Sequence, residues 1–276
     1  MPSLLPYAAP DYVYIDRLEL AEYHLAHIED GATVGFDIEA DHRGLGPRRS
    51  RTAKKELLQQ QIQSLGTFVI DWNRVSICVV QIATTSEVFV IHLRRMQALP
   101  KQLVRICTSN QIVKVGVGIY GDGQRLWDSF RINLNRALSL GHYARLVYPD
   151  SLQTGCPFGT EAGLAAIVEI TLGKSLSKEL QTSNWGATIL SSQQLAYAAI
   201  DSHATMSAYM TLQKTVARAN LIVDEDWYTC NSSSTEVELG VARRSHGYHG
   251  ALGGPRMAHF AVSLPSRLLA SVASVL

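Results

Sequence analysis

A seven-residue stretch, Thr33-Val-Gly-Phe-Asp-Ile-Glu39, constrains the fold of this chain most strongly. Its apolar residues alternate with polar or small ones, which is the period of a strand with one face in an apolar core. Asp37 and Glu39 leave the same face near the C-terminal end of this strand, where open α/β sheets bind their ligands. Two carboxylates held so close repel each other, so the pair indicates a divalent metal between them; a solvated polar face is the alternative.

Length and composition predict an intracellular, soluble protein with no membrane partner. The chain has 276 residues, of which 46% are hydrophobic, so it has room for one large or two small domains with a sizeable core. Its formal charge is only +1, so any nucleic-acid binding must be local. The four cysteines form no C-x-x-C pair, which predicts reduced, buried thiols. We find neither a basic leader nor the run of about 20 apolar residues that a membrane span needs.

β-branched runs and amphipathic segments predict a mixed sheet covered by helices. The expected strands are residues 33–39, 75–83, 87–93 and 112–118, with a hairpin turn at 84–86 and a further strand within 134–147. The expected helices start near residues 18 and 99, and cover 163–172 and 193–220, the last capped at Ser191-Ser192. Gly121 to Trp127 is predicted to be a tight turn feeding a helix, with Asp122 near its first turn, and 149–159 a loop.

Changes in composition predict the domain boundaries. We expect residues 1–30 to be a lead-in packed on the domain, residues 31–222 to form the domain, and residues 41–72 to be a basic insertion within it. Residues 223–276 contain Ser- and Gly-rich stretches and are predicted to be a largely disordered tail.

The insertion contains the strongest local positive charge of the chain, which we call the basic arm. It consists of Arg48, Arg49, Arg51, Lys54 and Lys55. The basic arm could clamp a phosphate backbone, act as a nuclear localisation signal, or keep a loop soluble. It favours the nucleus over the cytoplasm only slightly.

Two further acidic residues and a tyrosine extend the candidate site. Asp122 lies at a strand-to-helix turn and Asp201 on the last long helix. Tyr197 precedes Asp201 by about one helical turn, so both side chains share one face of that helix. A sheet of the predicted order brings these residues toward Asp37 and Glu39.

In three ordered blocks the chain resembles the tyrosine branch of the DEDD family of 3′-5′ exonucleases. The blocks are Phe36-Asp-Ile-Glu39, Lys114-Val-Gly-Val-Gly-Ile-Tyr-Gly-Asp122 and Tyr197-Ala-Ala-Ile-Asp201. The resemblance covers about residues 31 to 215 and is strongest to the Werner syndrome exonuclease domain and ribonuclease D-like enzymes. Three features depart from the family: Ala40 replaces a common Trp, the 41–72 insertion is long, and Gly141-His142 lies where relatives carry an Asp.

The resemblance implies a fold, a site and a reaction. The fold would be α/β, a ribonuclease H-like three-layer α/β/α arrangement around a central mixed five-stranded sheet. Asp37, Glu39, Asp122 and Asp201 would hold two Mg²⁺ or Mn²⁺ ions about 3.5 to 4 Å apart, and Tyr197 would orient the attacking water. The enzyme would release nucleoside 5′-monophosphates from the 3′ end of DNA or RNA. A catalytically silent exonuclease fold that binds nucleic acid or protein is the alternative, and the choice between DNA and RNA stays open.

Overall fold

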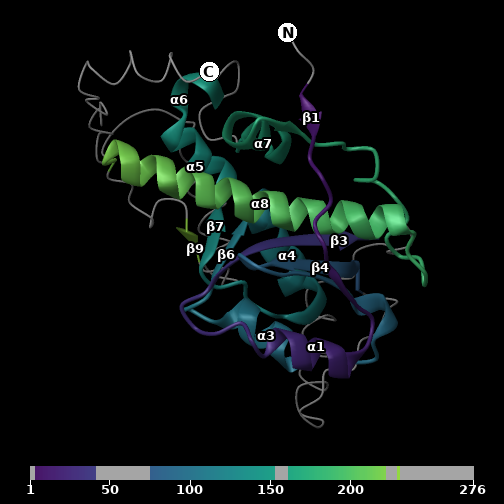
Figure 1. The fold of residues 1–276 in the computed structure, drawn as a ribbon. Helices are drawn as coiled ribbons and strands as arrows, with labels where there is room; N and C mark the ends of the chain where they lie inside the picture. The colour runs from purple at the N-terminus through teal and green to yellow at the C-terminus, as the bar shows by residue number, and fades with distance from the viewer. Residues whose placement is uncertain (1–3, 42–74, 153–160, 222–228, 231–276) are drawn as a thin grey trace, which may run out of the picture. The chain divides into compact units, whose positions relative to one another are not determined.

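A mixed β-sheet forms the centre of the protein (Figure 1). The computed structural model describes residues 4–41, 75–152 and 161–221 and the strand 229–230. Across these residues the strand order is β2-β5-β4-β3-β6-β7-β9. The strands are β2 (Val13–Ile15), β3 (Thr33–Ala40), β4 (Ile77–Ala83), β5 (Val88–His92), β6 (Val113–Gly116), β7 (Ala137–Ser139) and β9 (Thr229–Cys230). A separate pair joins β1 (Leu5–Pro6) to β8 (Lys174–Ser175).

The sheet is wider than the five strands predicted. The five predicted strands are β5, β4, β3, β6 and β7, which form the middle of the sheet. The short strand β2 adds to β5 in parallel at one edge, and β9 adds to β7 antiparallel at the other. The prediction placed β2 only within the packed lead-in and β9 within the tail, because two- and three-residue strands carry almost no periodic signal. Short pieces of the predicted lead-in and tail therefore belong to the sheet.

Strand β3 lies at the point where the sheet changes direction. It pairs antiparallel with β4, which places Asp37 opposite Gln81, and parallel with β6 on its other side. The predicted hairpin between β4 and β5 is confirmed, and in its turn the Thr84 hydroxyl oxygen accepts from the backbone N–H groups of Ser86 and Glu87. The register with β4 thus sets the face of the sheet on which the carboxylates of β3 lie.

Helices cover both faces of the sheet, as predicted (Figure 1). One layer contains α1 (Leu18–Leu25), α3 (Lys101–Thr108) and α4 (Ile119–Phe130); the other contains α5 (Leu140–Val147), α6 (Pro149–Leu152), α7 (Leu164–Leu172) and α8 (Ser192–Ala219). A 3₁₀ turn, η1 (Leu93–Arg95), follows β5. Two separate hydrophobic clusters fill the two interfaces, with Phe36 of β3 in the first and Val79 of β4 in the second.

The long helix α8 lies directly on β3. It begins with the predicted serine cap, in which the Ser191 hydroxyl accepts from the Gln194 N–H while the Gln194 side chain accepts from the Ser191 N–H. It ends at Asn220 in a left-handed conformation (φ 50°). A Cβ on Gly35 would collide with the Ser202 carbonyl oxygen, so glycine is needed for this close approach. The approach brings Asp201 down onto the strand that carries Asp37.

Several local predictions are corrected or confirmed. Helix α4 begins at Ile119, after Gly118 in a left-handed conformation (φ 71°), so the predicted tight turn is already helical. Residues 149–152 form α6 rather than a loop.

Cys78 and Cys107 are free and buried, as predicted. Within the described ranges, no helix has both the length and the apolar character to span a bilayer.

Candidate active site

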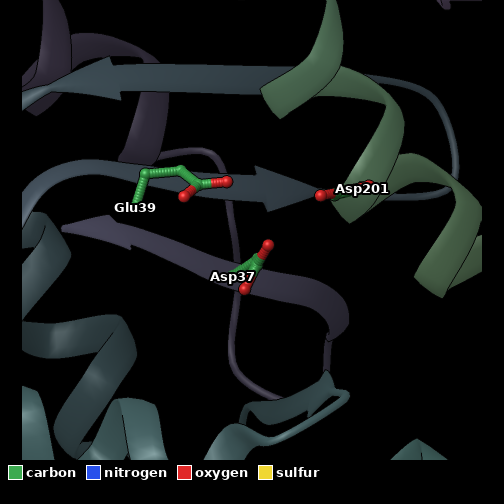
Figure 2. Close-up of side chains that lie close together, drawn as sticks. All are labelled: Asp37, Glu39 and Asp201. Atoms are coloured by element: carbon green, nitrogen blue, oxygen red, sulfur yellow. The ribbon is translucent and has the colours of Figure 1, made fainter. Parts of the chain in front are cut away.

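Three carboxylates from two elements meet on one face of the sheet (Figure 2). Asp37 and Glu39 come from β3, and Asp201 comes from the second quarter of α8. One carboxylate oxygen from each lies within 4.8 Å of the others. We call this set the acidic group. Its members are 164 residues apart along the chain at most, so only the packing of α8 on β3 assembles it.

The acidic group is largely removed from water, which sets its electrostatics. Glu39 is only 8% exposed, and Asp37 and Asp201 are half-buried. Burial raises the pKa of Asp37 to about 6. Burial and the neighbouring charge of Asp37 raise the pKa of Asp201 to about 8, and burial with repulsion from the other acids raises that of Glu39 to about 10. Without a cation, these carboxylates therefore resist ionisation.

The donor set fits a hard divalent cation. All three side chains offer carboxylate oxygens, the ligand type that Mg²⁺ and Mn²⁺ prefer. A cation between them would remove the repulsion that raises their pKa values, and burial would exclude competing water. We conclude that the residues present suit such an ion.

Asp122 lies beside the acidic group but is not a member of it. It is 3% exposed in the first turn of α4, where the helix dipole favours an anion. Burial and the charge of Asp37 raise its pKa well above the usual value, so Asp122 lies close enough to Asp37 to be affected by its charge. One Asp122 oxygen, however, accepts a hydrogen bond from Arg125 Nη1 at 2.9 Å. The structure thus brings three of the four predicted acids together and pairs the fourth with an arginine.

Tyr197 reaches the site as predicted. Its hydroxyl donates a hydrogen bond to the Asp201 carboxylate, which lowers the pKa of Asp201 and raises that of the phenol. Burial and the surrounding acids raise the phenol pKa far above its ordinary value. Its ring packs near Trp185, with centroids 6.0 Å apart. Such a phenol stays protonated at neutral pH, so it is suited to orient a water rather than to accept its proton.

A carboxylate from the segment before α7, that of Glu161, lies against Gly141. Glu161 Oε2 accepts from the Gly118 N–H at 2.9 Å, at the start of α4, and its Oε1 accepts from Ser139 Oγ at 2.7 Å. Ser139 Oγ also lies 2.6 Å from His142 Nδ1. A Cβ at Gly141 would collide with Glu161, so the glycine makes room for it. The Ser139 hydroxyl points at a carboxylate, so this trio supports α4 and is not a nucleophile with its base.

Sequence reasoning missed three residues at the site: Gln81, Arg125 and Glu161. Gln81 could have been found from the strand register, since it lies directly opposite Asp37. Arg125 follows Asp122 at the i+3 spacing of helical ion pairs, which is a usable but weak signal. Glu161 carries no signal in the sequence, because its place depends on the path of the chain after α6.

The basic arm falls in residues 42–74, outside the described residues, so its role stays a prediction.

Gln81 provides a test of the packing next to Asp37. Its side chain is fully buried, and neither amide atom has a hydrogen-bond partner among the described residues. A buried polar group without a partner costs about 1–3 kcal/mol, so Gln81→Met should raise the free energy of unfolding by that amount in urea titrations. The matched control is Gln213→Met, which removes an amide that donates to Tyr209 Oη at 2.7 Å and should lower stability. A loss of stability in Gln81→Met would contradict the prediction.

The raised pKa values predict how stability depends on pH. Unfolded Asp and Glu titrate near pH 4, whereas Asp37 and Asp201 in the folded protein titrate near pH 6 and 8. Between these values the folded state binds more protons than the unfolded state, so metal-free stability should fall as pH rises from about 4 to 8. Added Mn²⁺ should raise the melting temperature more at pH 8 than at pH 5.

The control for this pH dependence is the double variant Asp37→Asn, Asp201→Asn, melted in a chelator over the same range. Its melting temperature should fall less with pH than that of the wild type. A wild-type curve that is no steeper than that of the double variant would show that these carboxylates ionise freely in the folded state.

The fold and the acidic group together define a class: an α/β domain with a buried carboxylate site between a sheet and its covering helix. A family model described as a 3′-5′ exonuclease matches residues 69–217, more than half of the 276-residue chain. This chain belongs to the 3′-5′ exonuclease family. The matched range contains Asp122, Tyr197 and Asp201, while Asp37 and Glu39 lie before it and are joined to it by the structure.

Individual comparisons agree with this family. The mouse protein named bifunctional 3′-5′ exonuclease/ATP-dependent helicase WRN is 28% identical over 195 residues, covering 70% of this chain and 12% of that protein. The crystal structure of the Aedes aegypti Nibbler EXO domain has a TM-score of 0.54 and 19% identity, covering 75% of this chain and 89% of that one. The crystal structure of Escherichia coli RNase D has a TM-score of 0.54 and 14% identity, covering 88% of this chain and 52% of that one.

These structural likenesses show a shared ribonuclease H-like exonuclease fold. The chain spans less than half the length of the curated relatives that it matches.

Proposed function

We propose that this chain is a metal-dependent 3′-5′ exonuclease of the tyrosine branch, which hydrolyses phosphodiester bonds of DNA or RNA and releases nucleoside 5′-monophosphates. One observation supports it most: carboxylate oxygens of Asp37, Glu39 and Asp201 lie within 4.8 Å of one another. The family to which the chain belongs is described as 3′-5′ exonucleases. The hydrogen bond from Tyr197 to Asp201 supports the assignment to the tyrosine branch.

The acidic residues would hold Mg²⁺ or Mn²⁺ against the phosphate. Bound there, a divalent cation lowers the pKa of a water nucleophile and neutralises charge that develops on the phosphate oxygens. Asp37 would share a cation with Glu39 and Asp201, whose carboxylate oxygens lie within 4.8 Å of one another, and Asp122 would help to hold a second cation. Because a bound cation would remove the repulsion that raises their pKa values, it would favour the ionised form in which these acids act as ligands.

Tyr197 would position the water. Its phenol stays protonated and is held in place by Asp201 on one side and by packing near Trp185 on the other. Because its own proton is donated to Asp201, the phenol oxygen can accept a hydrogen bond from the water and hold it in place without taking its proton. Glu161 would hold the start of α4, and with it Asp122, through the Gly118 N–H.

The proposal is tested with a 5′-labelled oligonucleotide that carries a free 3′ hydroxyl, as DNA in one arm and RNA in the other. With Mn²⁺ we expect stepwise shortening from the 3′ end in at least one arm, and none in a chelator. The arm that shortens faster identifies the preferred substrate. Binding of oligonucleotides without shortening of either would instead favour a silent binding module and overturn the proposal.

A further inference from the structure

Arg125 combines properties that an ordinary helical ion pair lacks. Its partner Asp122 is almost fully buried, with 5% of the side chain exposed, whereas the arginine side chain is 42% exposed. The arginine thus lies at the rim of the site, with one guanidinium nitrogen on the buried acid and the rest of the group toward solvent. An i,i+3 pair on a helix surface would expose both partners.

The charge of Arg125 acts on the acids beyond its own partner. It lowers the pKa values of Asp37 and Glu39 as well as that of Asp122. Among the described residues, no other basic side chain lowers the pKa of any of these acids or of Asp201. The positive charge of Arg125 therefore acts on Asp37 and Glu39 of the acidic group as well as on its partner Asp122.

Most hydrogen-bond donors of the Arg125 guanidinium are not used by the described contacts. Of its five N–H groups, the described contacts use only the one from Nη1 to Asp122 Oδ1, at 2.9 Å. A guanidinium fork matches a phosphate better than any other side chain does, because it presents parallel donors to two oxygens. A phosphodiester brought to the acidic group by divalent cations would arrive within the reach of this rim arginine.

We propose that Arg125 is a catalytic residue that contacts the substrate: it pairs with Asp122 in the metal-free protein and donates to a non-bridging oxygen of the phosphodiester when divalent cations and nucleic acid are bound. This inference rests on the proposed function. Arg125 would then have one partner in each state. In the empty site its guanidinium neutralises Asp122, and once divalent cations neutralise that acid the guanidinium is free to contact the phosphate.

The proposal predicts opposite effects of Arg125→Gln on two ligands. Mn²⁺ titrated calorimetrically into the protein without nucleic acid should bind about two- to fivefold more tightly, because a competing positive charge is gone. An oligonucleotide whose 3′-terminal linkage has methylene in place of the 3′ oxygen cannot be hydrolysed there. With Mn²⁺ present it should bind about tenfold more weakly, with a salt slope reduced by about one.

Two comparisons separate this role from a structural one. In a chelator, Arg125→Gln should change oligonucleotide affinity little, because without metal the wild-type guanidinium is paired with Asp122 and does not contact the phosphate. Arg125→Lys should keep the salt slope but recover only part of the affinity, since an ammonium cannot make the forked contact. The matched control is Arg95→Gln, which removes a partly exposed charge of similar exposure, 39%, from its pair with Asp16 outside the acidic group. It should change neither binding constant.

The outcomes are distinct from those of the proposed function. If the wild type shows no Mn²⁺-dependent hydrolysis of either nucleic acid, the proposed function fails and this inference with it. If the wild type hydrolyses and Arg125→Gln behaves like Arg95→Gln in both titrations, the arginine only supports the helix and this inference alone is overturned.

Discussion

Replacing Asp37 with alanine is expected to abolish hydrolysis while leaving the fold intact. Asp37 has an oxygen within 4.8 Å of an oxygen of both other members of the acidic group, and its charge also raises the pKa of Asp122. Its loss should unseat the cation, which supplies several kcal/mol of transition-state stabilisation, so the rate should fall about 10³-fold or more. Because removing one buried acid relieves repulsion, the metal-free melting temperature should stay unchanged or rise.

Two further variants make this result specific. Asp37→Asn keeps the shape of the side chain and should lose activity as well, which separates loss of charge from a packing defect. Asp16→Asn removes a carboxylate that pairs with Arg95 outside the acidic group and should keep wild-type activity. Wild-type turnover by Asp37→Asn would exclude Asp37 from the site.

Tyr197→Phe is expected to lower kcat much more than it weakens oligonucleotide binding. The ring should keep its packing near Trp185, because only the hydroxyl is removed. In the proposed mechanism the lost contact is the hydrogen bond that would hold the water nucleophile, and losing such a group costs about 10²- to 10⁴-fold in rate. Metal affinity should change little, since the phenol is not a ligand in this scheme. Single-turnover cleavage at saturating protein measures the rate without a contribution from binding.

The control for Tyr197→Phe lies on the same helix. Tyr209→Phe removes a hydroxyl that accepts from Gln213 Nε2, away from the acidic group, and should leave the single-turnover rate unchanged. If both variants cleave within about twofold of wild type, far below the range expected for a positioned catalytic group, Tyr197 is only a core aromatic residue.

The elements that carry the site could be predicted because their signals are local. The alternation in β3 fixes the shared face of Asp37 and Glu39, and the serine cap fixes where α8 begins. The one-turn spacing from Tyr197 to Asp201 then places both side chains on one side of that helix. The ordered blocks connected these elements through a family resemblance, which spacing alone could not have done.

The remaining features depend on long-range packing. Whether Asp122 joins the other acids or pairs with Arg125 depends on how deeply α4 lies against β3, and no periodicity encodes that depth. The amide of Gln81 is buried because β4 is covered on both faces, although the residue itself is polar. Glu161 reaches Gly118 from 43 residues away. The edge strands β2 and β9 are too short to be recognised before their partners are known.

The most direct test of the central claim is to identify the product formed in water enriched in oxygen-18. A single-stranded oligonucleotide is incubated with the wild-type protein and Mn²⁺, and the released product is analysed by mass spectrometry. Attack by water on phosphorus with departure of the 3′ oxygen predicts a nucleoside 5′-monophosphate with one oxygen-18 in its phosphate, absent in a chelator and in Asp37→Asn. A nucleoside 3′-phosphate, an unlabelled phosphate or release that persists in Asp37→Asn would contradict the assignment of this site.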